Sequence, residues 1–450
     1  MKRQKNLLIL GGVLVALCAV IGIVSGVEKH IDKISTVSED IVNIDADALT
    51  QISWTADDKT LTFVKGDDGW TQSEDSYFPV DQEKISDLLE HFAPLTASFI
   101  IEDVEDYGQY GLDTPTETAT LTTADGDTTL QFGTYSTMDS KRYVTLGDGV
   151  VYLIDDDVTE ELSTDHDDFM QTDSVPEYDT IDSIVATGET AFTADYLPDE
   201  THTYTDAYDY YAVDGDSYTA LATSKIKSFI STLKKLDYSN YLTYRASTAD
   251  LSVYGMDAPA ETFTVTYTKD KEQSSFALSF AKGKDDGNYY FRMGDSEIIC
   301  KMDEDDYNDI VATTADTLRP DEALKLDWDS VTSVDFTLDG TTYTVTHKGS
   351  KYTLDGAEVD FDDIQSAVDG LDINAYNTET SDKKQEIAVT VHLDNKDYPT
   401  LTLCAYQYDG ENCLVTLNDT TLGFAKRSLV VNLQEAVNAV VLGGTDSTAE

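Results

Sequence analysis

The sequence predicts an α+β protein, in which an N-terminal transmembrane helix is followed by three consecutive repeat-like modules of antiparallel sheet with an amphipathic helix. Three observations predict this architecture. An uncharged apolar run lies near the N-terminus, a motif beginning Tyr-Gly occurs twice, and one helical spacing of apolar residues occurs three times. Because 450 residues correspond to about two to four domains of ordinary size, three modules also fit the length.

The first element is the apolar run from Leu7 to Val27, which contains no charged residue. Roughly 20 apolar residues span a bilayer core as a helix, so this run is long enough to cross. Basic residues precede it and Glu28 follows it, and basic flanks stay on the cytoplasmic side. We therefore expect a cytoplasmic tail over residues 1–6, a transmembrane anchor over residues 7–27, and an extracellular ectodomain after it.

Two kinds of processing compete with a retained anchor. The stretch Val24-Ser25-Gly26 has the character of a signal-peptidase site, so cleavage and secretion are the alternative. The apolar run is longer than the hydrophobic region of a usual signal peptide, which favours retention. Lipidation at Cys18 is disfavoured, because Leu17 stands where a small residue is needed.

Acidic side chains dominate the composition. The chain has 86 Asp and Glu against 30 Lys and Arg, which gives a formal net charge of −56. A surface this negative repels phosphate backbones, so nucleic acid is excluded as a partner. Apolar residues make up 40% of the chain, which is enough to build packed cores and argues against disorder throughout.

An amphipathic helix marks each predicted module. Apolar residues recur with the i, i+3, i+4, i+7 spacing of one buried helical face. The three sets are Ile85, Leu88, Leu89 and Phe92; Ile226, Phe229, Ile230 and Leu233; and Ile364, Ala367, Val368 and Leu371. Around each set, Thr, Val, Tyr and Phe alternate with polar residues, which is typical of antiparallel strands with one face in water. Asp-Gly pairs between these stretches indicate tight turns.

A turn box precedes a strand in the first two modules, as YGLDTPTETATLT and YGMDAPAETFTVT. Its glycine permits a positive φ, its proline extends the residue before it, and its aspartate can bond the turn backbone. The box residues are Tyr110, Gly111, Asp113 and Pro115, and then Tyr254, Gly255, Asp257 and Pro259. We favour a structural turn over a binding role for the aspartates, because a single active site seldom needs two copies.

These patterns divide the ectodomain. We expect a juxtamembrane linker over residues 28–43, modules over residues 44–174, 175–319 and 320–442, and a disordered tail over residues 443–450. The third module has no turn box, and we interpret it as a degenerate or capping copy. The second module carries an insertion between its first strands and its helix.

That insertion is rich in tyrosine: it contains Tyr204, Tyr208, Tyr210, Tyr211 and Tyr218. Aromatic faces stack on sugar rings, so Tyr208, Tyr210 and Tyr211 are candidate glycan-binding residues. The alternative, which we favour, is a Tyr-rich strand that covers its own sheet, because tyrosine is abundant throughout the chain.

Three cysteines follow Cys18. Cys404 and Cys413 flank the sequence AYQYDGEN, and a four-residue loop from Gln407 to Gly410 sets them opposite each other across a hairpin, which permits a disulfide. Two buried, reduced thiols in adjacent strands are the slightly favoured alternative. Cys300 has no evident partner, and no Cys or His spacing typical of zinc occurs in the sequence.

Motifs of catalysis are missing from the sequence. Its six histidines form no HExxH pattern, and no nucleophile elbow, Walker loop or dinucleotide fingerprint occurs. Acidic runs such as Asp155-Asp156-Asp157, Asp285-Asp286 and Asp303–Asp306 lack the calcium-loop pattern, so we expect solvated strand and helix ends there rather than a metal site. We therefore expect no enzymatic activity, no cofactor and no metal.

The turn box, together with Trp54 and Trp70 and the strand VVYLID, resembles the bacterial family called domain of unknown function 4340. The resemblance covers the first module well and the second moderately, and the third module falls outside the clear motif. It implies a membrane-tethered protein that is often encoded beside ABC-transporter components, and it supplies no catalytic residues.

The expected function is therefore that of a non-enzymatic, membrane-anchored extracellular protein. We expect an accessory or partner-binding subunit of an ABC-type transport system, single-pass in the cell membrane with its N-terminus in the cytoplasm. Its expected partners are the membrane, through Leu7 to Val27, and a transporter permease or related membrane protein. The alternative is a surface protein that binds a cell-wall polymer or another glycan.

Overall fold

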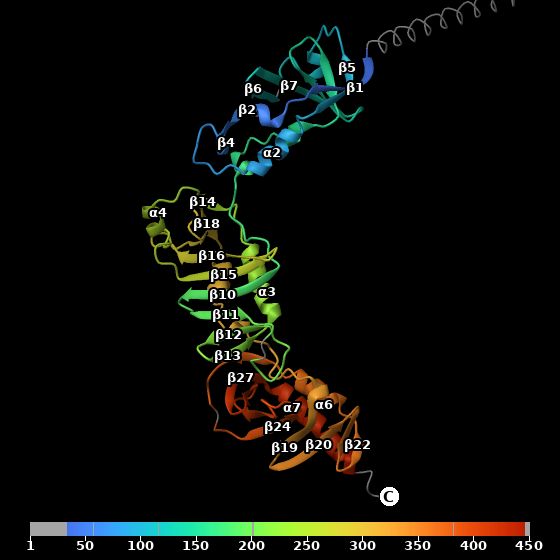
Figure 1. Ribbon diagram of the computed structural model, residues 1–450, viewed down its shortest axis with the longest axis vertical. Coiled ribbons are helices and arrows are strands. Elements are labelled where there is room, and N and C mark those ends of the chain that lie inside the picture. The colour runs from blue at the N-terminus through green and yellow to red at the C-terminus, as the bar shows by residue number, and fades with distance from the viewer. Residues whose placement is uncertain (1–33, 57, 116, 200–201, 381, 446–450) are drawn as a thin grey trace, which may run out of the picture. The chain divides into compact units, whose positions relative to one another are not determined.

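The computed structural model describes residues 34–445, except residues 57, 116, 200–201 and 381 (Figure 1). In this part of the chain the strands form three antiparallel sheets of nine strands each, and a few helices pack on them. The predicted α+β class with three sheet modules is confirmed. The predicted tail and anchor, residues 1–6 and 7–27, lie outside the described residues. Among the helices that are described, none is long and apolar enough to cross a membrane.

One compact unit ends at Thr172 and holds the first sheet. The strand order is β1-β5-β9-β8-β7-β6-β2-β3-β4. The strands are β1 Ile34–Val42, β2 Leu49–Ala56, β3 Lys59–Gly66, β4 Gly69–Gln72, β5 Leu95–Ile101, β6 Glu117–Thr123, β7 Gly126–Ser136, β8 Lys141–Thr145 and β9 Val151–Ile154. Helix α2, Gln82–Glu90, begins after Asp81, whose side chain caps its first turn, and it buries the apolar face that the spacing predicts.

The second compact unit begins at Asp173 and holds the other two sheets. In the second sheet the order is β13-β12-β11-β10-β15-β16-β17-β18-β14. The strands are β10 Thr180–Gly188, β11 Phe192–Tyr196, β12 Tyr210–Asp214, β13 Ser217–Leu221, β14 Tyr241–Thr243, β15 Glu261–Lys269, β16 Glu272–Lys282, β17 Tyr289–Met293 and β18 Ile299–Met302. The helices of this module are α3 Thr223–Lys234, α4 Thr248–Val253 and α5 Glu304–Val311.

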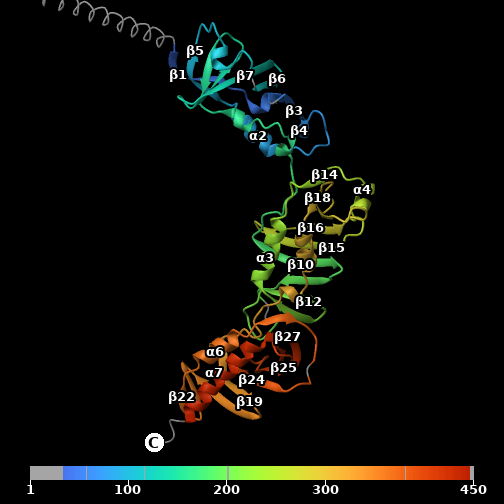
Figure 2. The same cartoon turned by 180° about the vertical axis from the view of Figure 1, so that it is seen from behind.

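The third sheet has the order β22-β21-β20-β19-β24-β25-β26-β27-β23. The strands are β19 Val331–Leu338, β20 Thr341–Lys348, β21 Lys351–Leu354, β22 Ala357–Val359, β23 Ile373–Tyr376, β24 Gln385–Leu393, β25 Thr400–Gln407, β26 Asn412–Leu417 and β27 Thr420–Lys426. Helices α6, Asp362–Asp369, and α7, Arg427–Thr445, lie side by side against this sheet (Figure 2).

The second and third sheets share one connectivity, and the first sheet shares most of it. In the second and third modules, four consecutive strands precede the helix, and five more follow it and return to pair with the first strand of the module. The strand orders of these two sheets are therefore the same when each strand is numbered within its module. The first sheet lacks the fourth strand before the helix and has β1 added at the opposite edge, beside β5. The third module thus keeps the whole topology, although its sequence has no turn box.

Alternating residues of the strands build the cores. In the first module Trp54 is 1% exposed and packs against Phe63 and Phe169, with ring centroids 5.6 and 5.2 Å away. Its indole N–H donates to the carbonyl of Ser163 at 2.8 Å, so this large side chain is buried without losing its hydrogen bond. In the third module the buried residues of β19 and β24 pack against apolar residues of α6 and α7.

Two segments near the ends differ from the prediction. Residues 28–43 are predicted as a linker, yet Ile34–Val42 forms β1 and pairs with β5. The reason is that the edge of a sheet presents unpaired backbone N–H and C=O groups, which an added strand satisfies. At the other end α7 runs to Thr445, so residues 443–445 are helical rather than disordered, and residues 446–450 lie outside the described part.

Candidate binding site

A pocket of about 270 Å³ lies within the unit that begins at Asp173, between the second and third modules. We call it the tyrosine pocket. Its aromatic wall consists of His202, Tyr204, Tyr208, Tyr218, Tyr376 and Tyr398. Arg319, Glu322 and Asn418 are polar residues of the lining, and leucines of the third module supply aliphatic surface. The pocket therefore combines ring faces with a small number of polar groups.

The wall from the second module comes from the inserted segment between β11 and β12, together with β13. The backbone amide of Lys325 donates to the Tyr204 hydroxyl at 2.9 Å. The Tyr398 hydroxyl donates to the carbonyl of His202 at 3.2 Å. These two hydrogen bonds join the insertion to the third module, and they position His202 and Tyr204 in the lining.

Ring stacking orders the second-module side of the pocket. The imidazole of His202 lies parallel to the ring of Tyr218, with centroids 3.7 Å apart and an interplanar angle of 7°. Tyr211 meets both of these rings edge to face, at 5.1 and 6.4 Å. Such contacts hold aromatic side chains in one orientation, so this wall is formed before any ligand binds.

The opposite side is organised around Tyr376 at the end of β23. The guanidinium carbon of Arg319 lies 3.8 Å from the centroid of the Tyr376 ring. Arg319 also pairs with Asp316 at 3.3 Å, and the Tyr376 hydroxyl donates to the carbonyl of Pro320. The segment that leads into the third module is therefore fixed to β23 by a cation–π contact and a hydrogen bond.

Burial raises the pKa of three phenols of the pocket above the ordinary tyrosine value. It raises the pKa of Tyr204 to about 12, although the Lys325 amide acts in the opposite direction. Burial likewise raises the pKa of Tyr376 to about 12, with Arg319 opposing it, and raises the pKa of Tyr208 further, helped by Tyr204 and Glu322. These hydroxyls stay protonated even at moderately alkaline pH, and a protonated hydroxyl can both donate and accept hydrogen bonds.

Of the three tyrosines proposed for glycan stacking, the structure brings only Tyr208 into the pocket. Tyr210 and Tyr211 are 4% and 0% exposed, so they cannot offer a ring face to a ligand. Their hydroxyls donate to the carbonyls of Ile181 and Tyr208 at 2.9 and 3.0 Å. The stacking role of Tyr210 and Tyr211 is thus corrected: neighbouring residues of β12 point to opposite faces, and both faces are covered.

Sequence reasoning missed the side of the pocket that is formed by Arg319 and the third module. Arg319, Tyr376 and Tyr398 carry no local motif, and they reach the insertion only through the packing of two modules. The sequence feature that pointed to this pocket was the Tyr-rich insertion. A segment so rich in aromatic side chains, with no counterpart in the other modules, is expected to pack against a neighbouring surface.

The turn boxes lie at corresponding places in the first two modules. Gly111 and Gly255 have φ of 70° and 76°, and a Cβ at Gly255 would lie 2.6 Å from the Lys282 carbonyl oxygen. Pro115 and Pro259 stand shortly before β6 and β15. Only glycine fits such a turn without strain, which is a structural role.

The tyrosine ring of each box contacts a tyrosine ring two strands away at a steep angle, 51° in the first box and 60° in the second. Tyr110 lies 4.9 Å from Tyr143, and Tyr254 lies 5.0 Å from Tyr290. Asp257 pairs with Lys284 at 2.9 Å, and this contact lowers the pKa of Asp257. The carboxylate thus meets a lysine in addition to a backbone amide of the turn, which the sequence indicates it can bond. In the first box, the hydroxyl of Thr114 donates to Asp113 at 3.5 Å.

Cys404 and Cys413 do not face each other. In the hairpin of β25 and β26, Cys404 is opposite Thr416 and Cys413 is opposite Gln407. The predicted register is therefore shifted by an odd number of residues, which places the two side chains on opposite faces of the sheet. Both are buried free thiols, as is Cys300. The disulfide is excluded in this register, and the reduced alternative matches the structure.

The acidic run at the end of β9 meets basic residues. Asp155 pairs with Lys141, Asp156 with His91 at 2.6 Å and Asp157 with Arg142 at 2.6 Å. In the second module, Asp286 accepts from Tyr290 at 2.5 Å, and Glu304–Asp306 lie in the first turn of α5, where the helix dipole favours carboxylates. The acidic runs therefore lie at the ends of strands and helices, as the sequence indicates.

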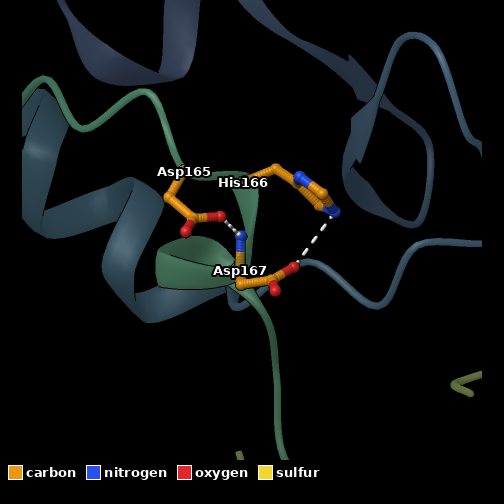
Figure 3. A group of neighbouring side chains, drawn as sticks. All are labelled: Asp165, His166 and Asp167. Atoms are coloured by element: carbon orange, nitrogen blue, oxygen red, sulfur yellow. Dashed lines mark hydrogen bonds and ion pairs between the residues drawn. The ribbon is translucent and has the colours of Figure 1, made fainter. Parts of the chain in front are cut away.

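One group of side chains in the first unit has the composition of a metal site. Potential ligand atoms of Asp165, His166 and Asp167 lie within 4.8 Å of one another, and all three residues are exposed (Figure 3). Asp165 accepts from the amide of Asp167 at 3.2 Å and so caps a short helical turn, while His166 contacts Asp167 at 3.0 Å and packs on Phe78. The turn itself explains their proximity.

No curated protein and no solved structure matches this chain. One family model matches it twice, over residues 70–245 and over residues 211–390. The first match begins in β4 and the second in β12, the corresponding strand one module later. Together the matches cover well over half of the sequence. The chain therefore belongs to the family described as domain of unknown function (DUF4340).

Proposed function

We propose that this protein is a non-enzymatic binding protein, anchored in the cell membrane by its N-terminal segment, and that it serves as an accessory subunit of an ABC-type transport system. The observation that carries the binding role is the tyrosine pocket. Its ring faces are fixed by stacking, and two of its phenols, Tyr204 and Tyr376, are largely withdrawn from water. A preorganised concave site of this composition is suited to taking up a ligand rather than to transforming one.

The anchor and the ectodomain support the transport role. The predicted helix over Leu7 to Val27 would hold three sheet modules outside the membrane, close to any permease. The description of the family assigns no activity, so the transport role is proposed from the predicted anchor and from the ABC-transporter context that the family resemblance implies.

Purification of the native membrane complex tests this role. The full chain, tagged at its C-terminus and made at its natural level, is captured under mild detergent, and its companions are identified by mass spectrometry. We expect an ATPase and a permease to be recovered with it. The control is residues 1–33 fused to the same tag, which reports partners held by the membrane segment alone. Repeated recovery of the full chain without transport components would overturn the proposal.

A surface protein that binds cell-wall polymer is the second candidate, and the exposed ring of Tyr218 beside His202 favours it. This function predicts that the full chain is retained on purified peptidoglycan. Lack of retention would count against it and would leave the transport role intact.

A further inference from the structure

We infer that the tyrosine pocket binds one uncharged saccharide ring of a soluble or polymeric glycan, an inference that rests on the proposed binding role. Three properties of the pocket support it: its size and ring faces, its mixture of hydrogen-bond donors and acceptors, and the sign of the surrounding charge.

Size and shape come first. A volume of about 270 Å³ is close to the lower limit for ligand pockets, which span roughly 300–1,000 Å³. One sugar ring with its substituents suits such a volume better than a peptide or a lipid chain. A pyranose also has an apolar face of C–H groups, and aromatic rings such as those of Tyr208 and Tyr376 provide the matching surface.

The hydrogen-bonding groups of the wall are of both kinds. Tyr204 accepts from the Lys325 amide, which leaves its own hydroxyl hydrogen for a ligand. Tyr398 donates to a carbonyl, which leaves its oxygen as an acceptor. Asn418 accepts from the amide of Thr402 at 2.8 Å through its oxygen, so its NH₂ group can donate. Sugar hydroxyls both donate and accept, and this mixed wall is complementary to them.

The negative charge around the pocket favours neutral sugars over anionic ones. The whole chain carries −56, and Glu322 adds a carboxylate to the lining. The one guanidinium of the lining, on Arg319, is already paired with Asp316 and stacked on Tyr376. A uronic acid or a phosphorylated sugar would therefore meet repulsion that a neutral ring does not.

Calorimetric titration of the full chain in lipid nanodiscs tests the inference. The probes are the neutral disaccharides diacetylchitobiose and cellobiose, and digalacturonic acid is the anionic comparison. We expect at least one neutral probe to bind, and the anionic one to bind at least tenfold more weakly. Tyr208→Ala and Tyr376→Ala should each weaken neutral binding at least tenfold. Tyr376→Phe keeps the ring and should lose less.

The matched control is Tyr135→Ala, which removes a tyrosine that is 44% exposed in the first sheet and should leave binding unchanged. Circular dichroism confirms that each variant is folded. The inference is overturned if neither neutral disaccharide binds, if digalacturonic acid binds equally well, or if both pocket variants bind like the parent chain. A chain that recovers transport components yet binds no sugar would refute this inference alone, whereas a chain that binds sugar without companions would refute the transport role alone.

Discussion

The carboxylate of Glu261 lies fully buried at the start of β15, where one of its oxygens accepts from both the amide and the hydroxyl of Thr190, at 2.8 and 2.9 Å. Thr190 belongs to the turn between β10 and β11. By strand register, the corresponding residue of the first module is Glu117, and that of the third is the buried Ile387. A buried acid thus holds a turn in the second module, at a position where the third module uses an aliphatic side chain.

Replacing Glu261 by Ala removes this acceptor. We expect the amide of Thr190 to lose its partner, at a cost of about 1–3 kcal/mol in the free energy of unfolding. Hydrogen exchange at Thr190 and urea denaturation measure the two effects. Glu272→Ala, at an exposed position of β16, is the control and should change stability by no more than about 0.5 kcal/mol. Equal behaviour of the two variants would show that the turn does not depend on Glu261.

Arg319→Ala should loosen the junction between the second and third modules. The change removes both the cation–π contact with Tyr376 and the pair with Asp316, which we expect to lower stability by about 1–2 kcal/mol. Urea denaturation followed through the fluorescence of Trp328 measures it in the third module. Arg319→Lys keeps the charge but not the planar stack, so it should give an intermediate loss. An unchanged midpoint for both variants would contradict the prediction.

Gly255→Ala should destabilise the second module through its turn box. The substitution forces a side chain into positive φ and brings its Cβ to 2.6 Å from the Lys282 carbonyl oxygen. We expect a loss of about 1–3 kcal/mol, measured by urea denaturation with circular dichroism. Gly294 also has positive φ, but a Cβ there meets no atom within 4 Å, so Gly294→Ala isolates the backbone strain. The difference between the variants reports the clash, and no difference would exclude it.

The stability of the first unit should depend on pH through Asp155. Hydrogen bonds from Lys141 and Ser98 lower the pKa of this carboxyl in the folded state. A group whose pKa falls on folding adds stability above its unfolded value of about 3.9, and that stability is lost as pH falls through the folded pKa. Asp155→Asn should therefore destabilise the unit at pH 7, and the difference from the parent chain should vanish at strongly acidic pH. Asp125→Asn, in an exposed turn, is the matched control for the change of side chain.

The three buried thiols should be inert in the folded protein. Burial raises the pKa of both Cys300 and Cys413 to about 12, so neither forms the reactive thiolate at neutral pH. We expect an aromatic disulfide reagent to label Cys300, Cys404 and Cys413 only after denaturant is added, as read by peptide mapping. A peptide containing Cys404 linked to Cys413 under non-reducing conditions would contradict the register of β25 and β26.

The repeated architecture could be predicted because its signals are local. The helix with Ile85, Leu88 and Leu89 buries the face that its spacing indicates. Gly111 and Gly255 adopt the positive φ that their turn boxes suggest. Each of these features depends on residues of a single turn or helix. Within such an element, residues that are close in the sequence are also close in space.

The register and the pocket could not be predicted in the same way. The hairpin that contains Cys404 and Cys413 pairs Gln407 with Cys413, and a loop placed nearer to Cys404 puts every side chain on the wrong face. The tyrosine pocket joins Tyr204 to Tyr376, and no pattern in the chain relates residues so distant. The surface against which the insertion packs is set by contacts between modules. Such contacts leave no periodic pattern of residues in a single sequence.

The edge position of β1 has a mechanical consequence. It is the first described strand, and it is held in the first sheet by its antiparallel ladder with β5, from Ile34 opposite Ile101 to Val42 opposite Leu95. Any tension transmitted by the preceding residues therefore enters the module through this one ladder. A pull directed away from the sheet would separate the residue pairs of the β1–β5 ladder one at a time, starting at Ile34. A pull along the strand would load all of these pairs together. The direction of such a pull thus sets how much force the first module withstands.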